Sequence, residues 1–419
     1  MPAAAHQRIT MNLFTEIREG FGISWDAIRA NKMRSVLTTL GIVIGIVTVT
    51  LMGTAIEGLN QAFMRNISML GADVFYVSRS GWINNNESDW RKAQRRRPLK
   101  LADAEKLRGE LTLSSAVAPA VDWNARVEYQ RRNSSGVYIV GTTEQYAQTS
   151  GVGVSAGRFL SAADAAGGRP VCVIGTQVAT NLFQGASPLG ERIKIGPQSF
   201  EVIGVLEKQG TFMGIFSLDN RAIIPLQQFM SVFWNNPDID IHVKARELVQ
   251  LDEAREELRF AMRRIRRLEP DAPDDFAINQ QEQFVEMFRR VAGTIAAIGF
   301  FITGLSLFVG GIGIMNIMFV SVAERTREIG IRKAIGAKRR TILLQFLTEA
   351  GCICLLGGAI ALSIAWPVTL LMNQLLPSKM SLTVAGIALL VSLITGVVSG
   401  FLPAWRAARM NPVDALRAE

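Results

Sequence analysis

The sequence predicts a membrane α-helical protein with four transmembrane helices and a large α+β domain inserted between helices 1 and 2. Two observations predict this fold class. A mean hydropathy of +0.22 is high for a soluble protein, whereas 19% charged residues is high for a membrane bundle alone. Four apolar runs are almost free of charge, and the long stretch 57–290 that separates the first two is more polar. The chain is therefore expected to be part membrane-embedded and part soluble.

Each apolar run is long enough to cross the hydrocarbon core of a bilayer, about 30 Å thick. The third run carries one acid, Glu349, and a proline near its far end. A signal peptide is the alternative for the first run, but about 35 residues precede it and no small-residue cleavage site is evident. We therefore interpret it as an anchor. The four runs are Val36–Ile56, Val291–Val322, Thr341–Met372 and Leu382–Leu402.

Basic residues set the orientation, because cytoplasmic loops carry an excess of Lys and Arg. The loop between the third and fourth runs has only Lys379. This places both termini and the loop 324–340 in the cytoplasm and the large domain outside. The basic residues cluster before the first run (Arg8, Arg18, Arg29, Lys32, Arg34), after the second (Arg325, Arg327, Arg332, Lys333, Lys338, Arg339, Arg340) and after the fourth (Arg406, Arg409, Arg417).

The N-terminal stretch has apolar residues at helical spacing, from Phe14 to Ile28. A helix lying on the inner leaflet fits this pattern best, with an ordinary packed helix as the alternative. The predicted organisation is a cytoplasmic amphipathic helix (1–35), transmembrane helix 1 with a stalk (36–70), the external core domain (71–279), a stalk with transmembrane helix 2 (280–323), a cytoplasmic helix (324–340), transmembrane helices 3 and 4 (341–403) and a cytoplasmic tail (404–419).

The external segment mixes strand and helix patterns separated by short turns, which indicates an α+β domain. The predicted stalk is the polar helical pattern that continues the first two runs over 57–70 and 280–290. The expected strands are Asp73–Val77, Val137–Val140, Pro170–Gly175, Arg192–Ile195, Phe200–Leu206 and Asp238–Val243, and the expected helices are Leu101–Leu111, Thr176–Phe183 and Leu248–Leu268.

One motif suggests an enzyme. Gly153–Gly157 matches G-x-S-x-G, the nucleophile elbow of serine hydrolases. That chemistry needs a strand–turn–helix context and a histidine base, but His242 is the only external histidine. The residues that follow predict instead a loop into a helix capped by Ser161 and Asp164. We therefore disfavour a hydrolase, and no catalytic residue is expected.

Metal, nucleotide and nucleic-acid sites are also disfavoured. Three cysteines and two histidines give no disulfide framework or metal-ligand spacing. No phosphate-binding loop of the G-x-x-x-x-G-K-[ST] type is present, so any ATP and Mg²⁺ are expected on a partner ATPase, with no cofactor in this chain. The basic runs Arg95–Arg97 and Arg263–Arg267 fall in the external domain, which favours a solvated face over nucleic acid.

Small residues inside the apolar runs predict close helix packing. They form two G-x-x-x-G pairs, Gly41 with Gly45 and Gly396 with Gly400. Glu349 is the one charged residue within a run, and an interhelical contact is the favoured role over a proton relay. Because no path of ionisable groups crosses the runs, an ion-coupled secondary transporter is disfavoured.

The most informative segment is the loop 324–340, which has seven basic residues and two acids. It is too charged to enter lipid, yet Ile329, Ile331, Ala334 and Ile335 are spaced too regularly for a flexible linker. We predict a short helix on the cytoplasmic face that contacts a partner.

Several segments together resemble the MacB/FtsX/LolC-type ABC transporter permeases, and the likeness covers nearly the whole chain. Each segment alone is modest evidence for the family, but together, in this order and at these places in the topology, the segments are highly specific. They are Arg29–Ser35, Gly157–Phe159 with Asp164, Val173–Gly175, Leu182–Phe183, Pro188–Gly190, Val202–Val205, Glu324–Ala337, Pro403–Ala408 and Asn411–Arg417.

The resemblance implies a multi-pass protein of the bacterial inner membrane, with the domain 71–279 as a MacB-like periplasmic core. It also implies a dimer of two copies or of this chain with a paralogue, a separate ABC ATPase subunit, and for some members a periplasmic adaptor and an outer-membrane channel. Residues of the loop 324–340 would couple to the ATPase, with Ile329 and Ile335 filling its groove. The expected coupling residues are Arg325, Glu328, Ile329, Gly330, Arg332, Ala334, Ile335 and Gly336.

The leading hypothesis is a permease that transmits ATP-driven motion to its periplasmic domain, driving efflux or extraction of a substrate. The alternative is an FtsX-like regulator of periplasmic cell-wall hydrolases. Drugs, peptides, lipoproteins, siderophores and glycolipids all remain open as substrates.

Overall fold

The computed structural model describes residues 32–83, 87–212, 216–374 and 380–417. The amphipathic helix predicted within 1–35 falls almost wholly outside these residues. The chain divides into two compact units. One is the membrane unit, residues up to 62 together with 290–419, and the other is the sheet domain, residues 63–289.

Four helices are long and apolar enough to cross a membrane, as the sequence predicts. All four extend beyond the apolar runs, mainly because polar residues that favour helices continue the pattern at their ends. At 44 residues α10 is about 66 Å long, roughly twice the hydrocarbon thickness. The helices are α2 (Lys32–Ile67), α10 (Gln281–Glu324), α12 (Arg339–Met372) and α13 (Leu382–Arg409).

Small residues line the contacts between these helices. A Cβ added to Gly41 on α2 would lie 3.2 Å from the Cα of Gly310 on α10, and one added to Gly45 would lie 3.1 Å from Leu307. On α13, a Cβ at Gly396 or Gly400 would lie 2.6 Å or 2.5 Å from side-chain atoms of α12. Close backbone approach of this kind is how membrane helices gain packing energy.

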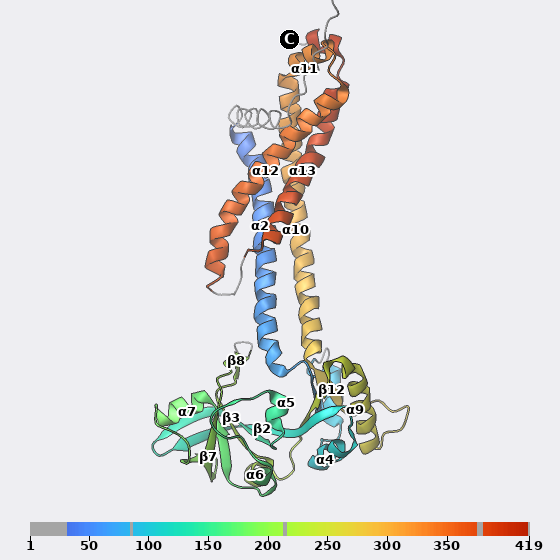
Figure 1. The fold of residues 1–419 in the computed structure, drawn as a ribbon. Coiled ribbons are helices and arrows are strands. Elements are labelled where there is room, and N and C mark those ends of the chain that lie inside the picture. Colours follow the sequence, from blue (N-terminus) through green and yellow to red (C-terminus); the bar gives the residue numbers. More distant parts are fainter. Residues whose placement is uncertain (1–31, 84–86, 213–215, 375–379, 418–419) are drawn as a thin grey trace, which may run out of the picture. The chain divides into compact units, whose positions relative to one another are not determined.

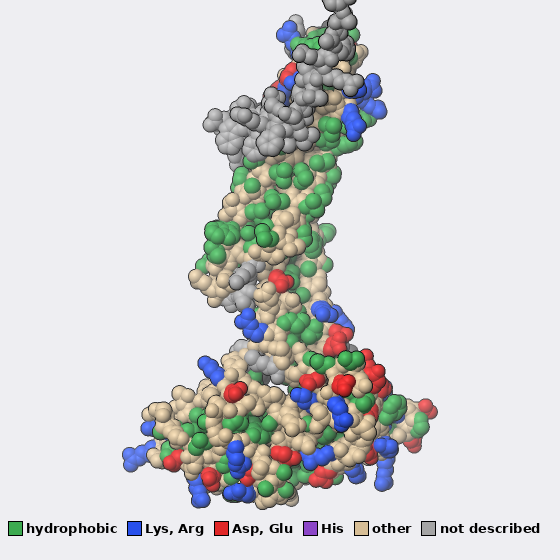
Figure 2. Space-filling view, viewed as in Figure 1, with side chains coloured by type: hydrophobic (Ala, Val, Ile, Leu, Met, Phe, Trp, Pro, Cys, Tyr) green, Lys and Arg blue, Asp and Glu red, His purple; other side chains and the backbone are tan. Residues whose placement is uncertain are grey.

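Large apolar side chains cover the outer surface of the membrane unit, whereas Lys and Arg gather near α11 (Figure 2). Phe301, Phe308 and Val398 are 75%, 67% and 69% exposed. In water such a surface would be strongly unfavourable, but in a bilayer the lipid tails solvate it. The chain is therefore a multi-pass membrane protein.

The sheet domain is built on a ten-stranded sheet with the order β12-β1-β11-β2-β3-β10-β5-β7-β4, in which β6 pairs with β2 and β7. Most neighbouring strands are antiparallel, but β10 runs parallel to β3 and β5 to β7. Its strands are β1 (Val74–Ser78), β2 (Ser114–Tyr129), β3 (Arg132–Thr142), β4 (Val154–Gly157), β5 (Val171–Ile174), β6 (Arg192–Ile195), β7 (Gln198–Leu206), β10 (Arg221–Pro225), β11 (Asp240–Ala245) and β12 (Ala277–Gln280). A separate hairpin pairs β8 (Thr211–Phe212) with β9 (Phe216–Ser217).

Helices cover this sheet at two places (Figure 1). Leu107 on α4 and Leu258 on α9 pack with Phe75 in one core, and Leu182 on α7 packs with Phe229 on α8 in another. The domain helices are α3 (Glu87–Arg95), α4 (Leu101–Glu110), α5 (Tyr146–Ser150), α6 (Ala162–Ala166), α7 (Thr176–Phe183), α8 (Leu226–Val232) and α9 (Leu251–Ile265), with short 3₁₀ turns at Ser68–Leu70 and Leu248–Gln250.

The segment after G-x-S-x-G folds as the sequence predicts. Ser161 caps α6, and the Asp164 carboxylate accepts from the Ser161 backbone at 3.0 Å, which completes a capping box. The Arg158 guanidinium lies 2.5 Å from Asp164 and holds the pKa of that carboxyl well below its usual range, against the opposing effect of burial.

Ser155, the serine of the motif, lies within strand β4, where its hydroxyl is 3.1 Å from the Val205 carbonyl oxygen. A strand followed by a loop lacks the sharp strand-to-helix turn of a nucleophile elbow.

Candidate functional site

Helix α11 (Thr326–Ala334) joins α10 to α12 in the membrane unit and lies beside the C-terminal residues of the chain (Figure 1). Gly336 ends it with a φ of 102°, a left-handed conformation that side chains disfavour. The Ala337 amide donates to the Arg332 carbonyl at 3.0 Å across this turn, and α12 then begins at Arg339. The short helix predicted within 324–340 is thus present, closed by a tight turn.

One face of α11 packs onto the tail helix α14 (Pro412–Arg417). A Cβ added to Gly330 would lie 2.9 Å from the Cβ of Ala415, so glycine lets the two helices approach closely. Ala415 is 1% exposed. Gly330 is therefore a packing position between α11 and the tail.

Ile329 on the same helix is 3% exposed and belongs to the core of the membrane unit, with Val322, Ile342 and Phe346. The Ile329 side chain is therefore turned into the bundle, toward α10 and α12, whereas the sequence-based prediction has it filling a groove on the ATPase. The helical spacing of isoleucines was correctly recognised, but sequence alone did not say which of them faces inward.

Lys333 ties α11 to the end of α13. Its ammonium group donates to the carbonyl oxygens of Ala408 at 2.8 Å and Met410 at 2.5 Å. These carbonyls lie at the C-terminus of α13, where a helix leaves acceptors unpaired and favours positive charge. Partial burial, with a smaller effect of Arg339, lowers the pKa of Lys333. Lys333 was not among the predicted coupling residues, because its partners lie far away in sequence.

Arg325 connects the start of α11 to α12. Its guanidinium lies 3.3 Å from the Glu349 carboxylate, which is almost completely buried. Removing one partner of such a pair leaves a buried charge without compensation, which is strongly unfavourable. Glu349 therefore makes an interhelical contact, the role favoured from sequence, and the Arg325 guanidinium is turned toward the bundle.

The opposite face of α11 is open. Ile335 is 82% exposed and Ile331 44% exposed. Glu328 and Arg332 form an exposed pair at 2.5 Å, and Arg332 also donates to Gln345 on α12 at 2.6 Å. Ala334 and Gly336 are exposed as well. Of the eight predicted coupling residues, this face brings together Glu328, Arg332, Ala334, Ile335 and Gly336, whereas Arg325, Ile329 and Gly330 hold the helix in place.

Within the residues that the structure describes, no group of three or more His, Cys, Asp or Glu side chains is placed to hold a metal ion. The chemistry available at α11 is that of an interface, a charged and partly apolar helix face mounted on a packed bundle.

Two protein-family models match this chain. Residues 35–261 match the family model of the MacB-like periplasmic core domain, and residues 300–412 match the FtsX-like permease C-terminal domain. The chain is a MacB/FtsX-type permease. The second match includes α11, and the first includes most of the sheet domain. The resemblance inferred from sequence is confirmed.

Two relatives have names that state an export function. The chain is 32% identical over 411 residues to the macrolide export ATP-binding/permease protein MacB of Bdellovibrio bacteriovorus, covering 97% of this chain and 62% of the relative. It is 32% identical over 408 residues to the pyoverdine export ATP-binding/permease protein PvdT of Pseudomonas syringae pv. tomato, covering 96% and 60%. The MacB-like permease thus spans about three-fifths of the length of these curated relatives.

A solved structure, the periplasmic region of MacB from Actinobacillus actinomycetemcomitans, is also similar. It shares 19% sequence identity with a TM-score of 0.45, covering 54% of this chain and 98% of that one.

Proposed function

We propose that this MacB-like permease works in the bacterial inner membrane as part of an ABC exporter, and that α11 receives motion from an ABC ATPase. One observation carries the proposal. Helix α11 is fastened to the bundle on one face while its other face, with Ile335 and the Glu328–Arg332 pair, is exposed. A helix that packs against the bundle in this way can be displaced by a partner without folding or unfolding.

The contacts of α11 with other helices explain how its displacement would be transmitted to them. Arg325 links it to α12 through Glu349, Lys333 links it to the end of α13, and Gly330 links it to the tail helix. Because α11 also follows α10 directly in the chain, a displacement of α11 acts on α10, α12 and α13 together. Packed bundles respond to such a displacement as rigid elements rather than by local deformation.

The long helices supply the path toward the sheet domain. α2 ends at Ile67 and α10 begins at Gln281, so both are continuous with the chain that enters and leaves this domain. We propose that they act as the stalk predicted from sequence. By the positive-inside rule, the basic residues around α11 support a cytoplasmic location for this end and a periplasmic one for the domain. Substrate is then handled outside the membrane rather than passed through the apolar spans.

The partners follow from the same scheme. ATP and Mg²⁺ would be bound by the ATPase, and two copies of the permease, or this chain with a paralogue, would face two ATPase modules. The relatives' names state macrolide and pyoverdine export, which supports export as the direction of transport. A periplasmic adaptor and an outer-membrane channel are further candidate partners.

The test is photo-crosslinking from single positions in native membranes. A benzophenone amino acid at Ile335, on the open face of α11, is expected to capture an ABC ATPase that mass spectrometry identifies. The matched control is the same amino acid at Phe308, which is 67% exposed on a membrane-spanning helix and is expected to capture lipid or another helix. If the ATPase were absent from the Ile335 adduct, or captured equally from both positions, the proposal would be wrong.

A further inference from the structure

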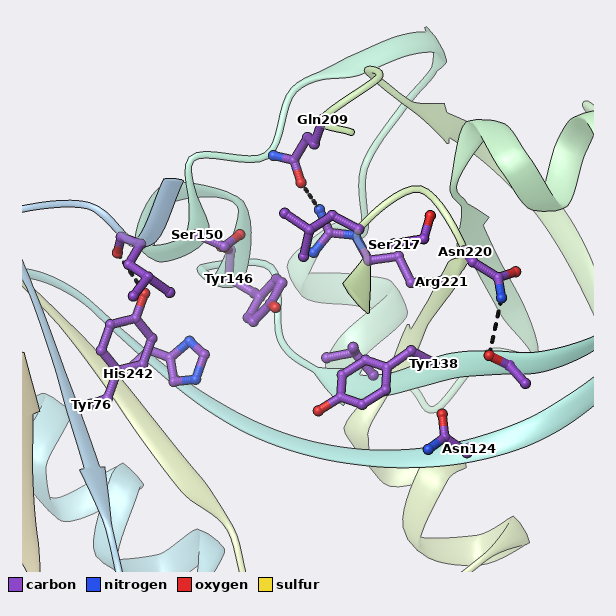
Figure 3. Close-up of a pocket in the computed structure, with 14 residues that line it drawn as sticks. Tyr76, Asn124, Tyr138, Tyr146, Ser150, Gln209, Ser217, Asn220, Arg221 and His242 are labelled. Carbon is purple, nitrogen blue, oxygen red and sulfur yellow. Dashed lines mark hydrogen bonds between the residues drawn. The ribbon is translucent and has the colours of Figure 1, made fainter. Parts of the chain in front are cut away.

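The sheet domain contains a cavity of about 590 Å³ that the coupling mechanism does not use (Figure 3). A volume of this size suits a small organic ligand. Its fourteen lining residues come from distant parts of the chain, including β1, β2, β3, α5, β10 and β11. They are Leu70, Tyr76, Asn124, Gly136, Tyr138, Val140, Tyr146, Ser150, Gln209, Ser217, Leu218, Asn220, Arg221 and His242.

Arg221 is the charged group of this cavity. It is 7% exposed, and no Asp or Glu is among the lining residues. One guanidinium nitrogen donates to the Gln209 side-chain oxygen, whereas Nε is buried and has no hydrogen-bond partner. A buried cation paired only with neutral groups is costly. An anionic group entering the cavity would offset this cost.

The remaining walls are largely aromatic. Tyr76 and Tyr146 are 9% and 7% exposed, and the His242 ring lies between them with centroid distances of 4.6 Å and 5.5 Å. Burial lowers the pKa of His242 to about 4, so the ring is neutral near pH 7. Its Nδ1 is buried without a hydrogen-bond partner. Flat aromatic surfaces with neutral polar groups between them suit a flat apolar ligand.

Three carboxyl groups outside the cavity, those of Asp122, Asp238 and Asp240, make its two ends electrostatically different. Asp122 interacts with the Tyr138 hydroxyl, and burial together with Asp122 and Asp238 raises the pKa of Asp240 to about 7. Asp122 therefore disfavours an anion beside Tyr138, whereas Arg221 supplies positive charge. An anionic group is favoured at the Arg221 end only.

We infer that this cavity binds a small aromatic ligand carrying one anionic group, with the anion at Arg221 and the ring among Tyr76, Tyr146 and His242. The inference does not depend on ATPase coupling, because the binding can be measured without ATP. A result that contradicts ligand binding in this cavity would therefore not contradict the coupling of α11 to an ATPase, and the reverse also holds.

Three probes of the same shape test the charge requirement: 2-naphthoate, the neutral 2-naphthamide and the cationic 2-naphthylmethylamine. Binding to the full-length chain in lipid nanodiscs is followed by ligand-observed NMR, with empty nanodiscs as background. Naphthoate is expected to bind saturably and at least about tenfold more tightly than the other two, as expected for a hydrogen bond to a charged group. Equal binding of all three probes, preference for the amine, or no saturable binding of naphthoate at millimolar concentration would overturn the inference.

Variants test whether naphthoate binds in this cavity. Arg221→Gln is expected to weaken naphthoate about tenfold or more, and Arg221→Lys to restore part of the loss because it keeps the charge. The matched control is Arg192→Gln, at an exposed arginine of the same domain, which should leave binding unchanged. Should Arg221→Gln fail to fold, Asn124→Trp fills the cavity from an exposed strand position and should abolish binding. Unchanged naphthoate affinity in Arg221→Gln, or in a folded Asn124→Trp, would refute the assignment.

Discussion

In the sheet domain the largest fully buried side chains include Phe75, Phe200 and Phe229, whereas in the membrane unit Phe301 and Phe308 are mostly exposed. The fully buried positions of the membrane unit hold many small residues instead, among them Ala350, Ala361, Cys354, Ser392 and Ala404. The difference follows from the solvent. Water drives large apolar side chains inward, but lipid tails solvate them equally well outside, so helices in lipid associate through close packing.

The same substitution in both units tests this contrast most strongly. Phe229→Ala removes a fully buried ring that packs against Gly141, and it should destabilise the sheet domain by about 3 to 5 kcal/mol. Phe308→Ala, at a position 67% exposed on α10, should change stability by no more than about 0.5 kcal/mol. Thermal unfolding of the full chain in nanodiscs would show the difference, and equal losses would contradict the explanation.

A second test concerns Glu349, a buried acid of the membrane unit that is paired with Arg325. Arg325→Met leaves the Glu349 carboxylate without its partner, and the loss should reach about 3 kcal/mol or more. The double variant Arg325→Met with Glu349→Leu should recover most of that stability, because an apolar pair replaces the ion pair. The same unfolding assay compares the stability of the single and double variants. A double variant as unstable as the single one would show that the ion pair itself is the stabilising element.

The smallest effect concerns packing at glycine. Gly396→Val places methyl groups where a Cβ already meets Cys354 Sγ at 2.6 Å, and it should cost about 1 to 3 kcal/mol. Gly386 on the same helix has nothing within 4 Å of an added Cβ. Gly386→Ala should therefore be neutral or stabilising by up to about 1 kcal/mol. Similar losses at both positions would show that the close contact with Cys354 does not determine the cost.

The sequence predicted the elements that depend on local pattern. Four apolar runs gave the four long helices, and the capping residue Ser161 with Asp164 gave α6. Thr176–Phe183 and Arg192–Ile195 agree with α7 and β6 residue for residue. Each rests on periodicity or capping chemistry within a few residues, which physical propensities capture well.

What the sequence could not give is the choice of distant partners. Strand β2 (Ser114–Tyr129) was missed because its composition, with Pro119 and several alanines, lacks a strand pattern, and it is held by pairing with β3, β6 and β11. The same holds at the candidate site. The residues near α11 in the sequence do not show that Lys333 donates to the end of α13 or that Gly330 packs against Ala415. The orientation of α11 therefore could not be predicted, and Ile329, which was expected to face a partner, packs into the bundle.

The position of the first and last strands of the sheet domain has a practical consequence. β1 and β12 are neighbours in the sheet, with Phe75 opposite Gln280, so the polypeptide enters and leaves the domain side by side. A domain whose two junctions meet can be exchanged by a single insertion without rerouting the host chain. Chimaeras that keep α2 and α10 and replace only residues between these junctions are therefore a direct way to exchange the sheet domain between relatives.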